Sequence, residues 1–155
     1  MNRLESGEPR EVIIYKIILD GKYRHMDAYV SLSDYVNSEA DEAIVHFYDT
    51  MNSNVDALED AYNEALLCSD IDMKKVSRLL DAYIQIGWDI IEDGDTCKIT
   101  DEELIRLMGK ADDFLELAEK HALKCLTRLG LPIEDELLYL VKRFPHSELQ
   151  IDDEK

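Results

Sequence analysis

The sequence predicts an α+β fold dominated by helices, in which an N-terminal β-hairpin packs on about five α-helices. Two patterns predict this fold. Asp20-Gly21 lies between two runs that are rich in β-branched and aromatic residues. From residue 38 onward, apolar residues instead recur at intervals of three and four, which is the spacing of helices with one buried face. The length of 155 residues fits one domain.

The hairpin is expected over residues 11–32. Asp-Gly is a strong signal for a two-residue type I′ turn, because that turn needs positive φ at both central positions. In this register Ile14 and Ile18 fall on the face opposite Tyr15, so both faces carry apolar groups. A hairpin alone is marginally stable in water. It must therefore pack on the helices, gain a third strand, for which residues 95–100 are a candidate, or pair with another chain.

Each expected helix has a polar cap or a proline at its start. Short polar side chains accept hydrogen bonds from the free N–H groups of a first turn, and proline fits that turn because it lacks an N–H. Thr100-Asp101-Glu102-Glu103 has the pattern of a capping box. The expected starts are Ser38, Asn54, Asp70, Thr100 and Pro132, and the expected stops are the Asn52-Ser53-Asn54 break, Gly94, Gly130 and Pro145.

These elements are expected to form one compact domain over residues 11–144, with the helices in 38–144. Residues 1–10 are polar, lack the apolar core of a signal peptide, and are expected to be a flexible lead-in. Residues 145–155 are expected to be a flexible acidic tail. No apolar run approaches the length of a membrane span. The three cysteines lack CxxC spacing and are expected to be reduced thiols of a cytoplasmic protein: Cys68, Cys97 and Cys125.

The net charge of −18 limits the classes of partner. Nucleic acids and anionic membranes are both bound through cations, so direct binding to either is not expected. A protein partner should carry a basic surface. The acids are unevenly distributed, because the stretch from His25 to Met73 contains twelve of them and no Lys or Arg. About one third of the chain therefore carries two thirds of the net charge.

Within this stretch, two expected helices turn acidic residues away from their apolar stripes. We predict that these residues bind the partner: Asp41, Glu42, Asp49, Asp56, Glu59, Asp60 and Glu64. Carboxylates at i,i+4 repeat at about 6 Å, close to the interval between phosphates along one DNA strand. The sequence therefore predicts a non-enzymatic binding protein that occludes a basic, nucleic-acid-binding surface in the manner of a DNA-mimic inhibitor. A purely solvated helix face explains the same acids, although such faces usually mix both signs of charge.

Two other functions fit parts of the sequence. The edges of the hairpin could pair with another chain, which suggests a toxin-neutralising partner, an adaptor or a homodimer. Glu39 with Glu42, and Glu116 with Glu119, could hold Mg²⁺ in a carboxylate-based enzyme, but both pairs are expected to face solvent, opposite the apolar stripes. We find no Glu-x-x-His pair, HExxH motif or glycine-rich phosphate loop. No catalytic residue, metal site or cofactor is therefore predicted.

Overall fold

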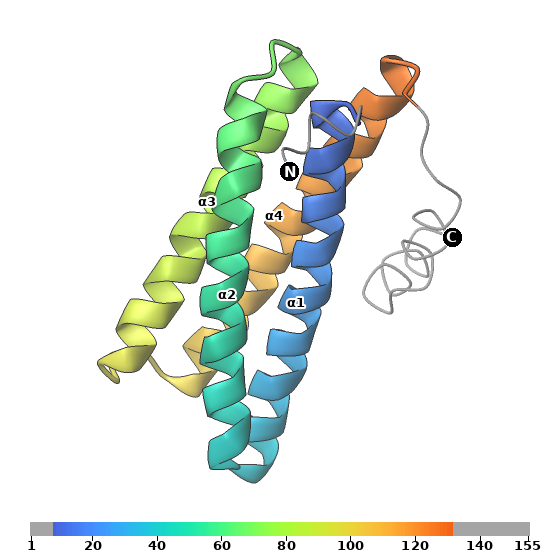
Figure 1. Cartoon of the computed structure of the whole chain (residues 1–155). Coiled ribbons are helices and arrows are strands. Elements are labelled where there is room, and N and C mark those ends of the chain that lie inside the picture. The colour runs from blue at the N-terminus through green and yellow to red at the C-terminus, as the bar shows by residue number, and fades with distance from the viewer. Residues whose placement is uncertain (1–7, 132–155) are drawn as a thin grey trace, which may run out of the picture.

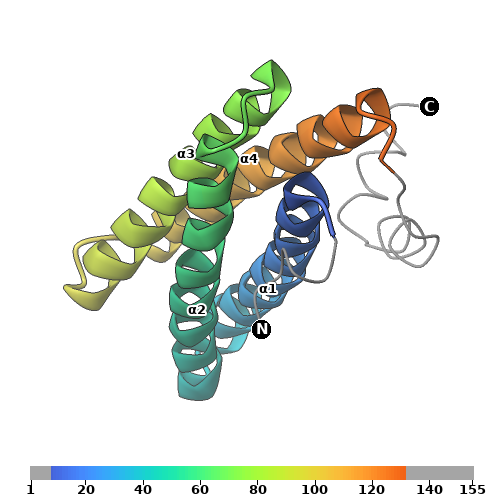
Figure 2. The same cartoon turned by 45° about the horizontal axis from the view of Figure 1, so that its top comes forward.

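The computed structural model describes residues 8–131, which form an antiparallel bundle of four helices (Figures 1 and 2). The helices are α1 (Arg10–Ser38), α2 (Asp41–Leu66), α3 (Ile71–Asp95) and α4 (Asp101–Arg128). Each helix packs on the next, and α4 packs back on α1, so the four surround one core. Short connections between long helices are typical of up-down-up-down bundles. Among residues 8–131 there is no strand, so the fold is all-helical and the predicted α+β class is wrong.

The predicted hairpin over residues 11–32 is the greater part of α1. Its apolar residues are buried at helical intervals, and Ile14 and Ile18, which the strand register placed together on one face, also share a face of the helix. Gly21 lies inside α1, where the side chain of Leu58 packs against it at a distance that a Cβ atom would not permit. Tertiary packing therefore overrides the Asp-Gly turn signal. The candidate third strand at residues 95–100 connects α3 to α4.

The predicted break at residues 52–54 is also wrong, because α2 continues through it. Asn54 is completely buried instead of capping a helix. Its side-chain amide donates a hydrogen bond to the backbone carbonyl of Gly21, 3.0 Å away. Ser38 is the last residue of α1, and Glu39, which follows it, has the left-handed conformation. Ala40 then precedes α2 and makes no side-chain cap.

Other predicted helix ends are confirmed. The side chains of Asp70 and Thr100 accept hydrogen bonds from the N–H groups of Asp72 and Glu103, at 2.8 and 3.2 Å. Gly130 has a φ of 74° beyond the end of α4, where the left-handed conformation favours glycine. Gly94 is one residue early as a stop, because α3 continues through Asp95. The predicted helix at Pro132, the lead-in before Glu8 and the tail at 145–155 lie outside the described residues.

Within residues 8–131, none of the four helices has the continuous apolar length that a bilayer crossing requires. Their apolar side chains are gathered between the helices, as expected for amphipathic helices. All four helices contribute large, completely buried side chains, which include Tyr15 and Ile18 of α1, Phe47, Met51 and Leu58 of α2, Tyr83 and Leu80 of α3, and Met108 of α4.

We predict that Gly87→Ala destabilises the fold although Gly109→Ala stabilises it. Alanine favours an interior helical position by about 1 kcal/mol over glycine. At Gly87, however, the new Cβ would lie 2.5 Å from Cγ2 of Val55, a β-branched side chain with little rotamer freedom in a helix. At Gly109 the nearest atom is the Tyr29 hydroxyl, at 3.6 Å. Urea unfolding should show a loss of about 1–3 kcal/mol for Gly87→Ala.

Adding Val55→Ala to Gly87→Ala should recover part of that loss, because the substitution removes the clashing methyl group. A double-mutant cycle measures this coupling directly. Equal unfolding free energies for Gly87→Ala and Gly109→Ala would contradict the close packing of α2 on α3.

The cysteines differ sharply in their surroundings. Cys68 and Cys125 are buried, whereas Cys97 is exposed between α3 and α4, and all three are free thiols as predicted. Burial, and then the neighbouring Asp70 carboxylate, raises the pKa of Cys125 to about 12. Burial, and then Glu11, raises the pKa of Cys68. Because the thiolate is the reactive form, these two thiols should be inert at neutral pH.

At pH 8, iodoacetamide should therefore modify Cys97 alone in the folded protein. A thiol with a pKa of about 12 is ionised in roughly one molecule in ten thousand at this pH, and folding also shields it. Mass spectrometry should show one adduct before denaturation, none in Cys97→Ser, and three after denaturation of the native sequence. Rapid modification of Cys125 in the folded state would contradict the packing of α4.

Candidate functional site

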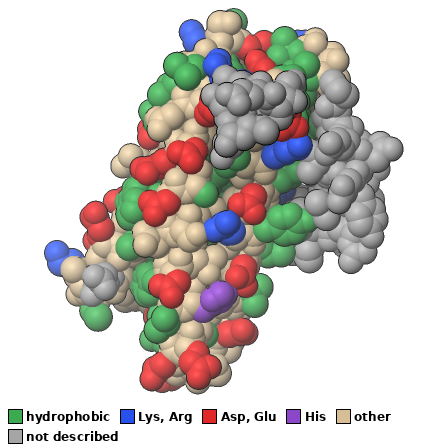
Figure 3. Space-filling model, viewed as in Figure 1, with side chains coloured by type: hydrophobic (Ala, Val, Ile, Leu, Met, Phe, Trp, Pro, Cys, Tyr) green, Lys and Arg blue, Asp and Glu red, His purple; other side chains and the backbone are tan. Residues whose placement is uncertain are grey.

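All seven predicted partner-binding residues lie on one helix, α2, rather than on two. They are all of the Asp and Glu residues of this helix, which contains no Lys or Arg. At 100° per residue they fall within an arc of about 140°, opposite the buried side chains. Figure 3 shows acidic side chains spread over the face of the bundle on which α2 lies in front. Asp41, Glu42, Asp49, Asp56 and Asp60 are exposed, and Glu59 and Glu64 are half-buried. We call these seven residues the acidic face.

The residues of the acidic face differ in how far neighbouring cations neutralise them. Glu64 pairs with Arg10 of α1 at 3.3 Å. The other six make no ion pair within residues 8–131. Asp41 and Glu42 occupy the first turn of α2, where carboxylates interact favourably with the helix dipole.

Acids of the same sequence stretch that lie outside α2 are more often paired. Arg128 of α4 binds Asp70 and Asp72 at the start of α3, both at 2.9 Å. His46 contacts Asp27 at 2.8 Å. The stretch from His25 to Met73, which lacks Lys and Arg in sequence, is therefore partly neutralised in space. The six unpaired residues of the acidic face are what remains as a concentrated surface charge.

The spacing along α2 limits the likeness to a phosphate backbone. Asp56 and Asp60 are separated by a rise of about 6 Å, whereas Glu42, Asp49 and Asp56 follow one another at about 10.5 Å. Glu64 would continue the shorter interval, but Arg10 pairs with it. The phosphate-like interval is thus confined to one end of the acidic face.

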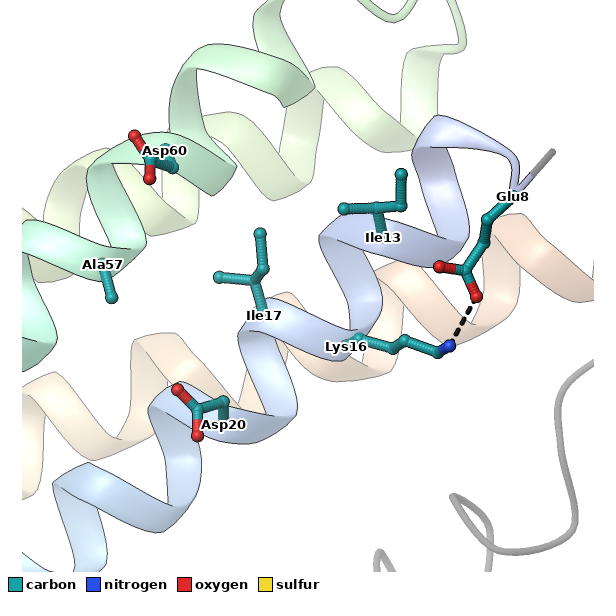
Figure 4. A pocket seen from close by; sticks show the side chains of 7 residues that line it. All are labelled: Glu8, Ile13, Lys16, Ile17, Asp20, Ala57 and Asp60. Atoms are coloured by element: carbon teal, nitrogen blue, oxygen red, sulfur yellow. Dashed lines mark hydrogen bonds and ion pairs between the residues drawn. The ribbon is translucent and has the colours of Figure 1, made fainter. Parts of the chain in front are cut away.

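A groove of about 400 Å³ lies beside that end, between α1 and α2 (Figure 4). Ile13 and Ile17 of α1 point toward α2, and Ala57 lies across from them. These three residues give the groove an apolar floor. Charged residues form its rims: Glu8, Lys16 and Asp20 on the α1 side, and Asp60 on the α2 side. Asp60 therefore belongs both to the acidic face and to the groove.

Two contacts between α1 and α2 bound the groove. Arg10 pairs with Glu64 near one end of it. Near the other end, the Arg24 guanidinium donates a hydrogen bond to the Ser53 hydroxyl at 2.6 Å. Arg24 also pairs with Asp20 one turn earlier in α1, at 2.9 Å. On the α1 rim, Lys16 pairs with Glu8. The α1 rim is therefore a set of ion pairs, whereas the α2 rim is acidic only.

The core contains a polar chain that the sequence did not reveal. Asn54 of α2 donates to the Tyr83 hydroxyl of α3 at 2.7 Å, and that hydroxyl lies 3.0 Å from Nδ1 of His25 in α1. Nε2 of His25 lies 3.2 Å from the Met108 carbonyl oxygen of α4. A carbonyl can only accept, so Nε2 of His25 carries a proton, and the Asp112 carboxylate lies 3.7 Å from the same nitrogen. The chain connects all four helices.

A buried ion pair lies on the same side of α1. Lys22 donates to Glu119 of α4 at 2.6 Å, and both side chains are less than a tenth exposed. Burial, and then the neighbouring Glu119 carboxylate, raises the pKa of the Tyr15 hydroxyl. The strand register placed Lys22 at a turn. On a helix, however, Lys22 and His25 fall at the spacing of Ile18 and Leu32, which is the signal that would have identified them as buried.

The carboxylate pairs considered for Mg²⁺ are not assembled into a site. Glu119 is buried rather than solvent-facing as predicted, and Lys22 occupies one of its oxygens. Glu39 lies in the connection between α1 and α2, and Glu42 lies in the first turn of α2. Among the described residues, no group of three or more His, Cys, Asp or Glu side chains could hold a metal ion.

We predict that Tyr83→Phe lowers the unfolding free energy by about 1–3 kcal/mol, because it removes the buried hydroxyl that accepts from Asn54 and contacts Nδ1 of His25. Tyr62→Phe is the matched control, since Tyr62 is half-buried and makes no hydrogen bond within residues 8–131. Urea unfolding followed by circular dichroism compares the two variants. An equally small effect of both would contradict the hydrogen-bond chain.

No family model, no curated protein and no solved structure matches this chain. The functional argument for the protein therefore depends on the charges and contacts of its own residues, above all those of α2 and of the groove beside it.

Proposed function

We propose that the protein is a non-enzymatic binding protein that uses the acidic face to occlude a basic surface of a partner protein. One observation carries this proposal: α2 presents seven acids and no Lys or Arg on its outward side. The neighbouring helix α1 shows the contrast, because it contains four acids and four bases. Charges of a single sign bring no advantage to a helix face that is only solvated. They do bring an advantage to a surface that attracts cations.

The physical consequence of such a face is rapid, salt-sensitive association. Charges of one sign raise the rate at which an oppositely charged partner arrives, and salt screens this attraction over about 10 Å at 0.1 M. The six unpaired acids keep their attraction for an incoming Lys or Arg, since no ion pair within residues 8–131 competes for them. The same charge repels a second copy of α2, which disfavours a homodimer through this face.

The partner surface in this proposal is one that normally binds nucleic acid, so the protein would act as an inhibitor. The interval between Asp56 and Asp60 supports this form of the proposal, because two Lys or Arg residues placed to bind successive phosphates could bind both carboxylates. The three reduced cysteines agree with a cytoplasmic location, which is part of the same proposal.

The other functions suggested by the sequence have lost their structural basis. The interaction module depended on hairpin edges, and residues 11–32 are helical. The Mg²⁺ enzyme depended on carboxylate pairs, of which Glu119 is held by Lys22 in the core. The acidic face therefore stands as the best-supported functional surface of the described residues.

Replacing Asp56, Glu59 and Asp60 together by Lys should abolish the capture of basic proteins from host lysate by the immobilised protein. The expected capture by the native sequence is strong at about 50 mM salt and lost at about 500 mM, because salt screens surface charges. Mass spectrometry identifies the captured proteins. A labelled DNA duplex then shows whether the native protein displaces DNA from them.

The matched control replaces Asp89, Glu92 and Asp93 of α3 by Lys. These three residues are also exposed, and the change in net charge is the same. Circular dichroism checks that both variants fold. Equal loss of capture in the two variants would show that net charge alone is responsible, and undiminished capture by the α2 variant would overturn the proposal.

A further inference from the structure

The groove between α1 and α2 lies directly beside the acidic face, and its floor differs in chemistry from its rims. Ile13, Ile17 and Ala57 line it with aliphatic groups, although Asp60 stands at its edge. An apolar floor beside a row of carboxylates suits a ligand that carries cations next to aliphatic side chains. A ligand with cations alone would leave the floor in contact with water.

We propose that this groove receives aliphatic side chains from a basic amphipathic helix of the partner. The proposal rests on the function proposed above, and it specifies the partner. An amphipathic helix that lies in an apolar groove is anchored by side chains three, four or seven positions apart. Its remaining faces are free to carry Lys and Arg.

The length of the groove fits this occupant. Along α1, the lining residues run from Ile13 to Asp20, which corresponds to a rise of about 10 Å. The contacts of Arg10 with Glu64 and of Arg24 with Ser53 lie near its two ends. Two anchors at i and i+4 of a bound helix are about 6 Å apart along its axis, so both fit between those contacts.

The charges of the two rims set the orientation of the bound helix about its long axis. On the α2 side, Asp56 and Asp60 have no cationic partner within residues 8–131. On the α1 side, the acids are already paired with Lys16 and Arg24, so this rim offers no excess negative charge to a cation. The basic edge of the bound helix should therefore lie over α2, with neutral or acidic residues over α1.

Charge complementarity also distinguishes this occupant from others. A second copy of the chain would bring a net charge of −18 to a surface that is itself acidic. Nucleic acids and anionic lipids would meet the same repulsion. A basic helix gains from both the floor and the α2 rim, and the groove needs no rearrangement of α1 or α2 to expose either.

Two synthetic helical peptides test the proposal. The first carries Lys on one edge and Leu at i and i+4, and the second has Ala in place of Leu, which preserves both charge and helix propensity. Fluorescence anisotropy with the full-length protein at about 100 mM salt measures both affinities. We expect the Leu peptide to bind at least tenfold more tightly than the Ala peptide.

Protein variants assign this preference to the groove. Ala57→Trp fills the groove and should remove the preference for the Leu peptide. If this variant does not fold, the smaller substitution Ala57→Met tests the same expectation. Gln85→Trp adds the same ring at an exposed position of α3 and should leave the preference intact. Retention of the full preference in Ala57→Trp and Ala57→Met would overturn the groove proposal.

A charge variant separates this proposal from the function on which it rests. Asp56→Asn with Asp60→Asn should weaken both peptides by a similar factor and leave the ratio between them unchanged. If this variant binds both peptides as tightly as the native protein does, the acidic face is not the attracting surface and the proposed function is wrong. If the native protein binds the two peptides equally and in a salt-sensitive way, the groove proposal alone is wrong.

Discussion

The hydrogen-bond chain from Asn54 through Tyr83 and His25 to the Met108 carbonyl is the constraint on which the arrangement of the helices depends. Apolar side chains alone tolerate sliding of one helix along another, because many offsets bury similar areas. Directional hydrogen bonds in a buried layer do not, since a shift of one turn would leave several polar groups without partners. The chain includes one group from each helix and therefore fixes all four relative to one another.

That constraint extends to the surface. Fixing Gly21 of α1 against Asn54 of α2 also fixes Ile17 against Ala57, about one turn away along each helix. Arg10 then reaches Glu64, which leaves Asp56, Glu59 and Asp60 as the acids of α2 that have no cationic partner at this end of the described bundle. The distribution of surface charge thus follows from the polar contacts of the core. The buried pair of Lys22 and Glu119 adds a second directional contact between α1 and α4.

Much of the helical part of the fold could be predicted from the sequence, because caps and apolar stripes are local signals. Asp70 and Thr100 cap helices as expected, and the acidic residues of α2 face outward as expected. The N-terminal region could not be predicted in the same way. Asp20-Gly21 is a turn signal in isolation, and only the packing of Leu58 against Gly21 shows why glycine is present there.

Asn54 was misassigned for a similar reason. A short polar residue in a polar stretch has the composition of a helix start, and its buried role depends on Gly21 and Tyr83, which are distant in sequence. The groove was equally inaccessible to sequence reasoning, because its floor combines one residue of α2 with two of α1 from a segment that had been interpreted as strand. Long-range contacts, rather than local propensities, determine both features.

The continuity of α2 through residues 52–54 has a consequence for how a partner must be shaped. From Asp41 to Asp60 the acidic face extends over about 29 Å of uninterrupted helix, with no joint at which it could bend. The charges are held at fixed intervals before any partner arrives, so little conformational entropy is lost on association. Because α2 holds its carboxylates at fixed positions along a straight axis, a partner whose cations lie on a compact, rounded patch could bind only a part of the acidic face.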